Sequence, residues 1–403
     1  MFSRIAFYWL STKDLNLKRP HWQSTKKIDR RETASYNFLT CKGSLIQKEL
    51  QSMVTAEGSW RSVAVLSRPQ RGLNPGHTSG DTMKIRAFIT IFALLLFAAT
   101  LAAQSPSPAA QPAGKMLLER LGYPPDAKLL IVHADDLGMA HSINRASIKG
   151  LESGLVTSAS IMVPCPWLPE IADFARSHPD ADLGLHLTLT SEWALYRWGP
   201  VLPKERVPSL LDSKGYLYPT ESEAAKHIDP KEAEAEIRAQ IARARALGIE
   251  PTHLDSHMGT LYQTQALFET FFRVSRDHKL LIRVSKEWFA EAPFLPSLLG
   301  PDDVVMNSII SIGPNVAAAA WSKFYIDTIK NIQPGITEMI VHLAYDDEEM
   351  RGVAFNHPAW GSEWRQRDFD FVTSDAFRKL LQENGVKLIT WREISQRLQK
   401  RAR

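Results

Sequence analysis

The residues with the clearest potential for chemistry are two adjacent acids that follow an apolar run. Residues 129–134 are mostly apolar, Asp135 and Asp136 come directly after them, and Gly138 marks a turn. Such a run predicts a buried strand, and sites in α/β proteins lie at the carboxyl ends of these strands. Adjacent carboxylates repel each other unless a positive charge, commonly a metal ion, lies beside them. The pattern therefore suggests a metal site, with a surface turn carrying two acids as the alternative.

Histidines recur where three further strands are expected to end. His186 lies in an apolar strand, and His342 follows Glu-Met-Ile-Val. His253, Asp255 and His257 alternate along another segment, and a period of two places all three on one side of a strand. Each residue alone could be structural, but their joint occurrence at strand ends indicates a shared site. One carboxylate and two imidazoles suit zinc and similar divalent ions, and leave positions open for water and substrate.

These residues are positioned by strand-like and helix-like segments that alternate along the chain. We predict strands over residues 129–134, 159–163, 182–189, 251–256, 280–284, 304–310, 338–343 and 386–390. We predict helices over 116–121, 142–153 with Ser142 as N-cap, 169–177, 230–247 capped by Asp229, 261–278, 288–299, 316–332, 374–383 and 391–401. This alternation predicts either an open doubly wound sheet or an α/β barrel. We favour a distorted (β/α) TIM-like barrel of seven or eight mostly parallel strands.

The first part of the chain has a different character. Residues 83–103 have a short basic start, an apolar centre and small residues at the end, which is typical of a secretory signal peptide. A single-pass anchor is the alternative, although the apolar centre is short for a membrane span. We expect residues 1–82 to be a poorly ordered extension and hypothesise that Met83 is the true start. Residues 104–126 are predicted to be a tether and short lead-in to a domain over 127–403.

Composition agrees with a globular, exported protein. Hydrophobic residues make up 44% of the chain, and the formal net charge is +4. Residues 1–82 hold 13 Lys and Arg against 6 Asp and Glu, so the basic excess lies there, and no basic face in the remainder indicates nucleic-acid binding. If maturation removes Cys41, Cys165 is left alone and no internal disulfide can form. We expect a periplasmic or secreted protein with no stable membrane span after signal cleavage.

Four motifs resemble those of the YdjC family in order and spacing. They are ADDLG at 134–138, GLVTSAS at 154–160, LGLHLTL at 183–189 and PTHLDSH at 251–257. That family includes chitooligosaccharide deacetylases and hopanoid-associated deacetylases, and the similarity covers roughly residues 127–400. The resemblance implies a distorted β/α barrel related to polysaccharide deacetylases, which agrees with the predicted alternation of elements.

The resemblance also implies roles for individual residues. Asp136, His186 and His257 match the family's three metal ligands, and Asp135 matches the acid beside the metal, which would be the general base. His342 matches a histidine on a late strand and is the candidate general acid. One divalent ion, magnesium or zinc, is the cofactor that this set implies.

Four further residues are candidates for supporting roles. His253 and Asp255 are expected to orient the metal ligands, as residues around metal sites commonly do. Trp193 and Tyr262 offer flat apolar surfaces with a polar edge, on which a sugar ring could stack; ordinary loop packing is the alternative for each. The chain departs from the family at His133, where relatives often carry Asn. That departure, like the signal peptide, puts the substrate in question more than the chemistry.

These features predict a metal-dependent hydrolase that removes the N-acetyl group of an amino sugar or oligosaccharide, giving acetate and a free amine. A secreted sugar-binding protein without turnover is one alternative. Another is a different metal hydrolase, such as a phosphoesterase, although two-metal phosphoesterases usually need more ligands than these. The expected partner is an N-acetylated carbohydrate, and a homodimer is one possible assembly.

Overall fold

The strands predicted from the sequence are all present in the computed structural model, which describes residues 113–401. The predicted extension and signal peptide lie outside the described residues, as does the start of the predicted tether. The strands are β1 (Lys128–Leu137), β2 (Ser158–Ile161), β3 (Leu183–Leu187), β4 (His253–Ser256), β5 (Leu281–Ile282), β6 (Ser308–Ser311), β7 (Gly335–Val341) and β8 (Val386–Leu388).

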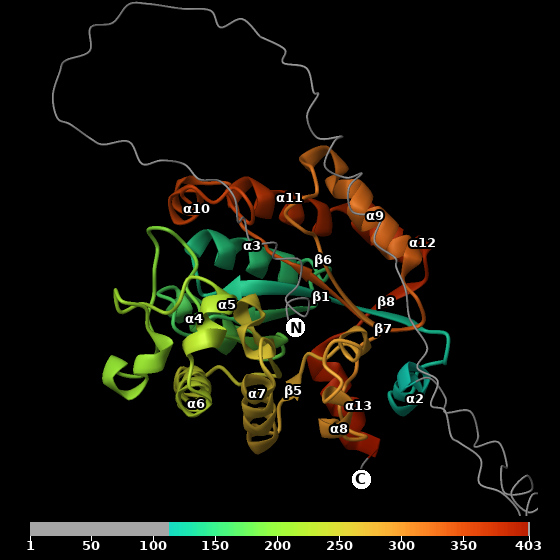
Figure 1. Cartoon of the computed structure of the whole chain (residues 1–403). Coiled ribbons are helices and arrows are strands. Elements are labelled where there is room, and N and C mark those ends of the chain that lie inside the picture. The colour runs from blue at the N-terminus through green and yellow to red at the C-terminus, as the bar shows by residue number, and fades with distance from the viewer. Residues whose placement is uncertain (1–112, 402–403) are drawn as a thin grey trace, which may run out of the picture. The chain divides into compact units, whose positions relative to one another are not determined.

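Parallel pairing joins these strands in the order β5-β4-β3-β2-β1-β7-β6, and β8 pairs with the start of β1. An isolated parallel bridge between Ser285 and Met306 connects the segment after β5 to the segment before β6. The sheet therefore curls until its two ends meet, with helices on both sides of the strands (Figure 1). This is the distorted barrel that we favoured over the open sheet.

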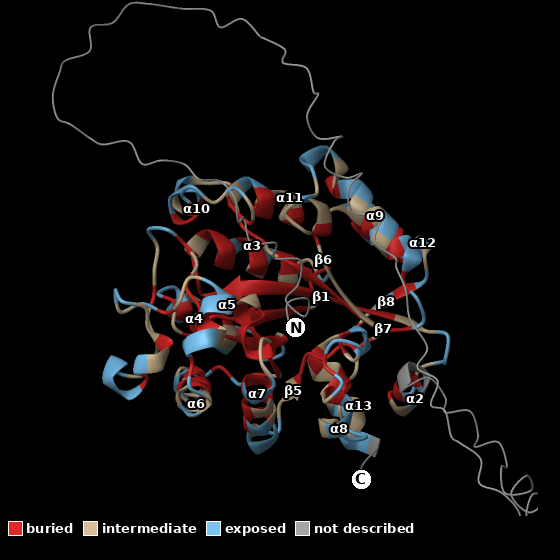
Figure 2. Cartoon of the chain, viewed as in Figure 1, coloured by how far each residue is buried: buried red, intermediate tan, exposed pale blue. Residues whose placement is uncertain are grey.

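The central strands are buried on both faces. Every residue of β2, β3, β4 and β7 is buried, as is every residue of β1 after Lys128 (Figure 2). Strands covered on both sides read as continuous apolar runs rather than as an alternating pattern. This explains why the strands were visible in the sequence, and why the His and Asp residues within them stood out.

Helices cover the strands from outside, and their outward faces are exposed (Figure 2). They are α2 (Ala113–Arg120), α3 (His141–Glu152), α4 (Leu168–Ser177), α5 (Glu221–His227), α6 (Pro230–Ala246), α7 (Gln265–His278), α8 (Leu295–Leu298), α9 (Trp321–Asn331), α10 (Glu348–Val353), α11 (Ser362–Val372), α12 (Asp375–Glu383) and α13 (Trp391–Arg401). None of the helices in the described part of the chain is long and apolar enough to cross a bilayer. The predicted cap of α6 is confirmed, since the Asp229 side chain accepts a hydrogen bond from the Lys231 amide.

The predicted cap of α3 is wrong. Ala140 occupies the N-cap position without a side-chain hydrogen bond, and Ser142 instead donates its hydroxyl proton to Asp347. The first amides of the helix, those of His141 and Ser142, donate to the Glu349 carboxylate at 3.1 and 2.7 Å. A carboxylate more than 200 positions away thus does the work of a local cap, which no local pattern could reveal.

Two predicted helices are interrupted. The helix expected over 261–278 divides into a 3-10 segment (His257–Tyr262) and α7, because the Thr264 side chain caps α7 by accepting a hydrogen bond from the Leu267 amide. The helix expected over 288–299 is reduced to a 3-10 turn (Lys286–Trp288) and the short α8. Pro293 and Pro296 lie in that segment, and proline disrupts a helix interior.

The barrel and its last helix are tied together by Asp182. This buried carboxylate, just before β3, accepts hydrogen bonds from the amides of Trp391 and Arg392 at 2.7 and 3.0 Å, at the start of α13. We expect Asp182→Ala to lower the free energy of unfolding by about 1–2 kcal/mol, as loss of a helix cap does. Asp182→Asn keeps an acceptor oxygen and should lose less. Urea unfolding of both variants tests this, and equal losses would contradict the capping role.

Candidate active site

Asp135 and Asp136 both line one cavity, although neighbouring side chains in a regular strand point to opposite faces. The backbone of Asp136 has a φ of 74°, in the left-handed region that few residues other than glycine adopt, though Asp tolerates it. The pairing of β1 with β2 shifts register between Ala134 and Leu137. This irregularity at the end of β1 is what lets two consecutive carboxylates reach the same site.

Asp136, His186 and His257 form a compact buried group. Asp136 Oδ1 lies 3.5 Å from His186 Nε2 and 3.4 Å from His257 Nδ1. Two atoms that bind one zinc ion at a tetrahedral angle lie about 3.4 Å apart, given metal–ligand bonds of about 2.1 Å. Asp136 Oδ1 is buried without a hydrogen-bond partner. The sequence-predicted ligands are therefore brought together, and their atoms fit one divalent ion.

A carboxylate holds the far nitrogen of each histidine in this group. His186 Nδ1 lies 2.5 Å from Asp255 Oδ1, and His257 Nε2 lies 2.9 Å from Glu192 Oε2. Such contacts fix the ring and leave its other nitrogen for a metal, which is common around metal sites. The structure thus places Asp255 where we expected it, as an orienting group for His186. Glu192, in the segment after β3, was not predicted.

The charges around His257 favour a cation. Burial lowers the pKa of His257, but the carboxylates of Glu192 and Asp136 outweigh burial and raise that pKa to about 10. Burial raises the pKa of Asp136, and the Arg365 guanidinium together with the neighbouring histidines brings it well below its ordinary value. Asp136 therefore remains ionised, and positive charge at His257 is stabilised, whether it comes from a proton or from a metal ion.

The two oxygens of Asp135 have different surroundings. Oδ1 lies 3.2 Å from His133 Nε2 and 3.4 Å from both the Ser160 hydroxyl and Arg283 Nη2, so three donors hold it in the interior. Oδ2 lies 3.7 Å from His186 Nε2, on the side of the candidate metal ligands. Burial raises the pKa of Asp135, but the charges of His186 and Arg283 lower it below its ordinary value. One oxygen is thus held by interior donors, and the other faces the candidate metal ligands.

His342 follows β7 and lies on the free side of Asp135. Its Nε2 is 4.0 Å from Asp135 Oδ2, and its Nδ1 is buried without a hydrogen-bond partner. Burial lowers the pKa of His342 to about 4, so the ring is neutral at pH 7. The backbone amide of His342 donates to Asp368 Oδ2 at 3.0 Å. The predicted acid therefore lies beside the predicted base and would need to gain a proton before giving one.

Helix α11 contributes two polar residues that the sequence analysis missed. Arg365 is buried, and its Nη2 donates to Asp136 Oδ2 at 2.7 Å, which leaves Asp136 Oδ1 for a metal. Asp368, one turn further along, accepts hydrogen bonds from the Tyr325 hydroxyl and from the backbone of His342. The spacing of three residues places both on one face of the helix, so a charged pair of this kind was a signal open to the sequence analysis.

His253 packs deeper in the barrel than we expected. Its ring stacks on Trp391 with centroids 5.1 Å apart, and meets the ring of His133 edge-on. It also lies against Gly184, where an added Cβ would come within 2.4 Å of the ring. These contacts place His253 in the packing of the barrel interior, and its role in orienting a metal ligand stays a prediction.

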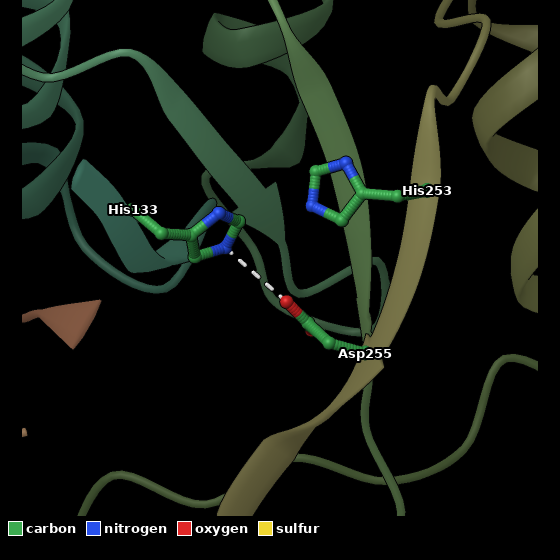
Figure 3. A group of neighbouring side chains, drawn as sticks. All are labelled: His133, His253 and Asp255. Carbon is green, nitrogen blue, oxygen red and sulfur yellow. Dashed lines mark ion pairs between the residues drawn. The ribbon is translucent and has the colours of Figure 1, made fainter. Parts of the chain in front are cut away.

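A second group of possible ligands, His133, His253 and Asp255, has atoms within 4.8 Å of one another (Figure 3). Asp255 Oδ2 lies 3.2 Å from His133 Nε2 and 2.9 Å from Arg283 Nη2. Asp255 Oδ2 and His253 Nε2 are also buried without a hydrogen-bond partner, but the Arg283 guanidinium already balances the charge of this carboxylate, which disfavours a metal ion here. We therefore assign the candidate metal site to Asp136, His186 and His257.

A cavity of about 270 Å³ opens over these groups, and Trp193 and Tyr262 are among the residues that border it. Trp193 Nε1 donates to the Met139 sulfur, and the Tyr262 hydroxyl donates to the Arg283 carbonyl. Both side chains are almost completely buried, at 1% and 5% exposed, so little ring surface reaches the cavity, and this favours the packing alternative over stacking on a sugar. Further apolar lining comes from Met258, Ile309, Ile310, Ile312, Phe324 and Trp360.

Comparison with known proteins agrees with this geometry. The model of the YdjC-like protein family matches residues 129–383. This chain belongs to the YdjC family. A carbohydrate deacetylase of Thermus thermophilus is 32% identical over 289 residues, covering 70% of this chain and 99% of that protein. A chitooligosaccharide deacetylase of Klebsiella pneumoniae is 24% identical over 272 residues, covering 66% and 99%.

A solved structure shares the fold. It is a crystal structure of an Enterococcus faecalis protein named for a proposed role in cellobiose-phosphate cleavage, with a TM-score of 0.55, 24% identity, and coverage of 66% of this chain and 98% of that one. The YdjC match contains every site residue described above, from His133 to Asp368. It ends at Glu383, before β8 and α13. The site is therefore a property of the part that this chain shares with the YdjC family.

Proposed function

We propose that this chain is a metal-dependent carbohydrate deacetylase, which hydrolyses the N-acetyl group of an amino sugar or oligosaccharide to acetate and free amine. One observation carries the proposal. The free oxygen of Asp135 lies 3.7 Å from His186 Nε2, at the edge of the Asp136–His186–His257 group and within one cavity. A base beside a candidate metal site is what hydrolysis of an amide requires. The deacetylase names of YdjC relatives support this class of reaction.

Asp136, His186 and His257 would hold one divalent ion, zinc or magnesium. When bound, the ion would polarise the acetyl carbonyl and lower the pKa of a water molecule. Asp255 and Glu192 keep the two imidazoles oriented, and Arg365 occupies the second oxygen of Asp136. Each of these contacts leaves the metal-facing atom of the ligand free.

The chain's own residues would move the protons. Asp135 Oδ2 accepts a proton from the attacking water, because Oδ1 is already held by interior donors. The water oxygen bonds to the acetyl carbon, and the bond from that carbon to the amine nitrogen then breaks. His342, 4.0 Å from Asp135 Oδ2, takes up the proton and delivers it to the leaving amine. Acid–base groups of this kind contribute roughly 10²–10⁴-fold each.

Two other functions remain as competing outcomes. A sugar-binding protein would need a cavity that accepts a sugar ring but not a base with a free, ionised oxygen. A two-metal phosphoesterase would need a second ion. Two other groups of possible ligands, His133–His253–Asp255 and Asp135–His186–Asp255, share Asp255. The Arg283 guanidinium lies 2.9 Å from Asp255 Oδ2, which does not favour a second ion there.

The location and assembly of the protein are also proposals. The signal peptide predicted over residues 83–103 would place the enzyme in the periplasm or outside the cell, where it would meet N-acetylated polysaccharide fragments. A homodimer is one assembly that such an enzyme could adopt. N-terminal sequencing of the mature protein from its producing cells, and its mass in solution, would test these two points.

Removal of the metal provides the first test of the function. We expect the full-length protein to release acetate from at least one member of a panel of N-acetylated mono- and oligosaccharides. Acetate release should fall at least about 100-fold with chelator and return with added zinc or magnesium, since the ion supplies several kcal/mol of charge stabilisation. Binding of a sugar with no acetate released from any member, despite bound metal, would favour the binding protein. Phosphate released from sugar phosphates would favour the phosphoesterase.

A further inference from the structure

The interior of the barrel holds an imidazole that joins two carboxylates of the site. His133, from β1, is completely buried. Its Nε2 lies 3.1 Å from the Ser160 hydroxyl, which in turn donates to Asp135 Oδ1, and 3.2 Å from both Asp135 Oδ1 and Asp255 Oδ2. Figure 3 shows the ring of His133 directed across the barrel toward Asp255 on β4. A single nitrogen thus faces the candidate base and the carboxylate that orients His186.

The other side of the ring is held equally firmly. His133 Nδ1 lies 3.0 Å from the Ser158 hydroxyl and 3.4 Å from Glu338 Oε1. Burial lowers the pKa of His133, but the hydrogen bonds to Asp135 and Asp255 outweigh burial and raise it to about 9. A buried cation with both nitrogens engaged has one orientation available, so it can fix the position of the groups that it contacts.

We propose that His133 is a positioning residue for the hydrolysis: its Nε2–H, together with the Ser160 hydroxyl that it contacts, holds Oδ1 of Asp135, so that Oδ2 is presented to the attacking water. The same N–H meets Asp255, whose other oxygen lies 2.5 Å from His186 Nδ1. His133 therefore links the base to the carboxylate behind a metal ligand, and it sets the distance between base and metal site. The inference rests on the proposed function, because it assigns Asp135 as the base.

Two other roles compete with this one. His133 could merely neutralise buried carboxylates, in which case its loss would lower stability and nothing more. Alternatively, His133, His253 and Asp255 could bind a second ion. If His133 only neutralises buried carboxylates, a neutral residue at position 133 should lower stability, but the protein that remains folded should keep the wild-type kcat. The second alternative predicts two tightly bound ions per chain, one of which disappears on His253→Ala.

Two substitutions at His133 separate positioning from packing. His133→Leu fills much of the space without a donor, whereas His133→Gln can place an amide N–H near the position of Nε2. Ser158→Ala is the matched control, because it removes a contact to Nδ1 and leaves the contact with Asp135 intact. The measurements are kcat and KM for acetate release on the best substrate, the number of bound zinc ions per chain, and the midpoint of thermal unfolding.

We expect His133→Leu to lower kcat about 10- to 100-fold, the size of effect seen when groups behind a metal site are removed. KM and one bound zinc ion per chain should be unchanged, and His133→Gln should recover part of the lost kcat. Ser158→Ala should lose less kcat than His133→Leu, because Glu338 still faces Nδ1 and Nε2 keeps its contacts. If His133→Leu does not fold, the test compares the kcat of His133→Gln with that of Ser158→Ala, and we expect the lower kcat in His133→Gln.

The inference would be overturned if the folded His133 variants kept wild-type kcat, if His133→Gln turned over no faster than His133→Leu, or if a second ion depended on His253. Failure of the proposed function has a different signature. In that case the wild-type protein itself would release no acetate from any substrate.

Discussion

Asp135→Asn is expected to lower kcat for acetate release by about 10²–10⁴-fold while one metal ion per chain remains bound. The amide has nearly the shape of the carboxylate, so it can still fill the space between His133 and Arg283. It cannot accept a proton from water at Oδ2, which is the step assigned to this residue. The proposed metal ligands Asp136, His186 and His257 are untouched by the change, so the variant should lose activity without losing metal.

The matched control for this variant is Asp136→Asn, one position along the chain. Asp136 Oδ1 lies 3.4–3.5 Å from both metal-facing imidazole nitrogens, so weakening this ligand should lower metal content as well as turnover. Metal analysis after dialysis, together with steady-state kinetics at saturating substrate, distinguishes the two adjacent acids. Full turnover in Asp135→Asn would show that another group acts as the base.

The sequence could reveal the strands and the metal-facing residues for one physical reason. A strand buried on both faces is an apolar run, so a His or Asp at its end is conspicuous, as at His186 in β3 and His257 after β4. Parallel strands open at one edge of a barrel, so these residues could be expected to converge. The family resemblance then added the roles of Asp135 and His342, which spacing alone did not supply.

The residues that support the site were harder to find, because they are charged residues buried by contacts distant in sequence. Arg365 and Asp368 occupy the buried face of α11, so this helix lacks an apolar stripe and was not predicted. Arg283 lies just after β5, and its charge is offset by Glu338 from β7 at 2.7 Å. Glu192 follows β3 without regular structure. A buried charge needs a partner, but only the fold shows which one.

The conformation of Asp136 was also beyond the sequence. Two adjacent acids at the end of a strand would ordinarily point to opposite faces, and the prediction of one site assumed that both could face it. The positive φ of Asp136 and the register shift of β1 against β2 make that assumption hold. Backbone strain of this kind is maintained by surrounding contacts, here the Arg365 guanidinium on Asp136.

The second large effect is expected at His257. We expect His257→Ala to lose the tightly bound ion and to reduce acetate release to background, because only Asp136 and His186 would remain to hold a metal. The change also leaves the Glu192 carboxylate buried without its imidazole partner, which would add to the loss of stability. The two effects can be separated by comparing the thermal unfolding midpoints of the metal-free wild type and the metal-free variant. Without metal, the midpoints differ only through loss of the Glu192–His257 contact and of the side chain itself.

Glu192→Gln is the control for the predicted loss of metal in His257→Ala. The glutamine can still contact His257 Nε2 but carries no charge, so metal should bind about 10- to 100-fold more weakly rather than not at all. High zinc should then restore turnover in Glu192→Gln and fail to restore it in His257→Ala.

If excess zinc rescued both variants equally, His257 would not be a required ligand, and the ion would have to be held by other atoms. The nearest available oxygen is Asp135 Oδ2, 3.7 Å from His186 Nε2, and its use as a ligand would remove it from the role of base. If His257 is not a metal ligand, Asp135 would therefore have to be one, and Asp135 could not then act as the base.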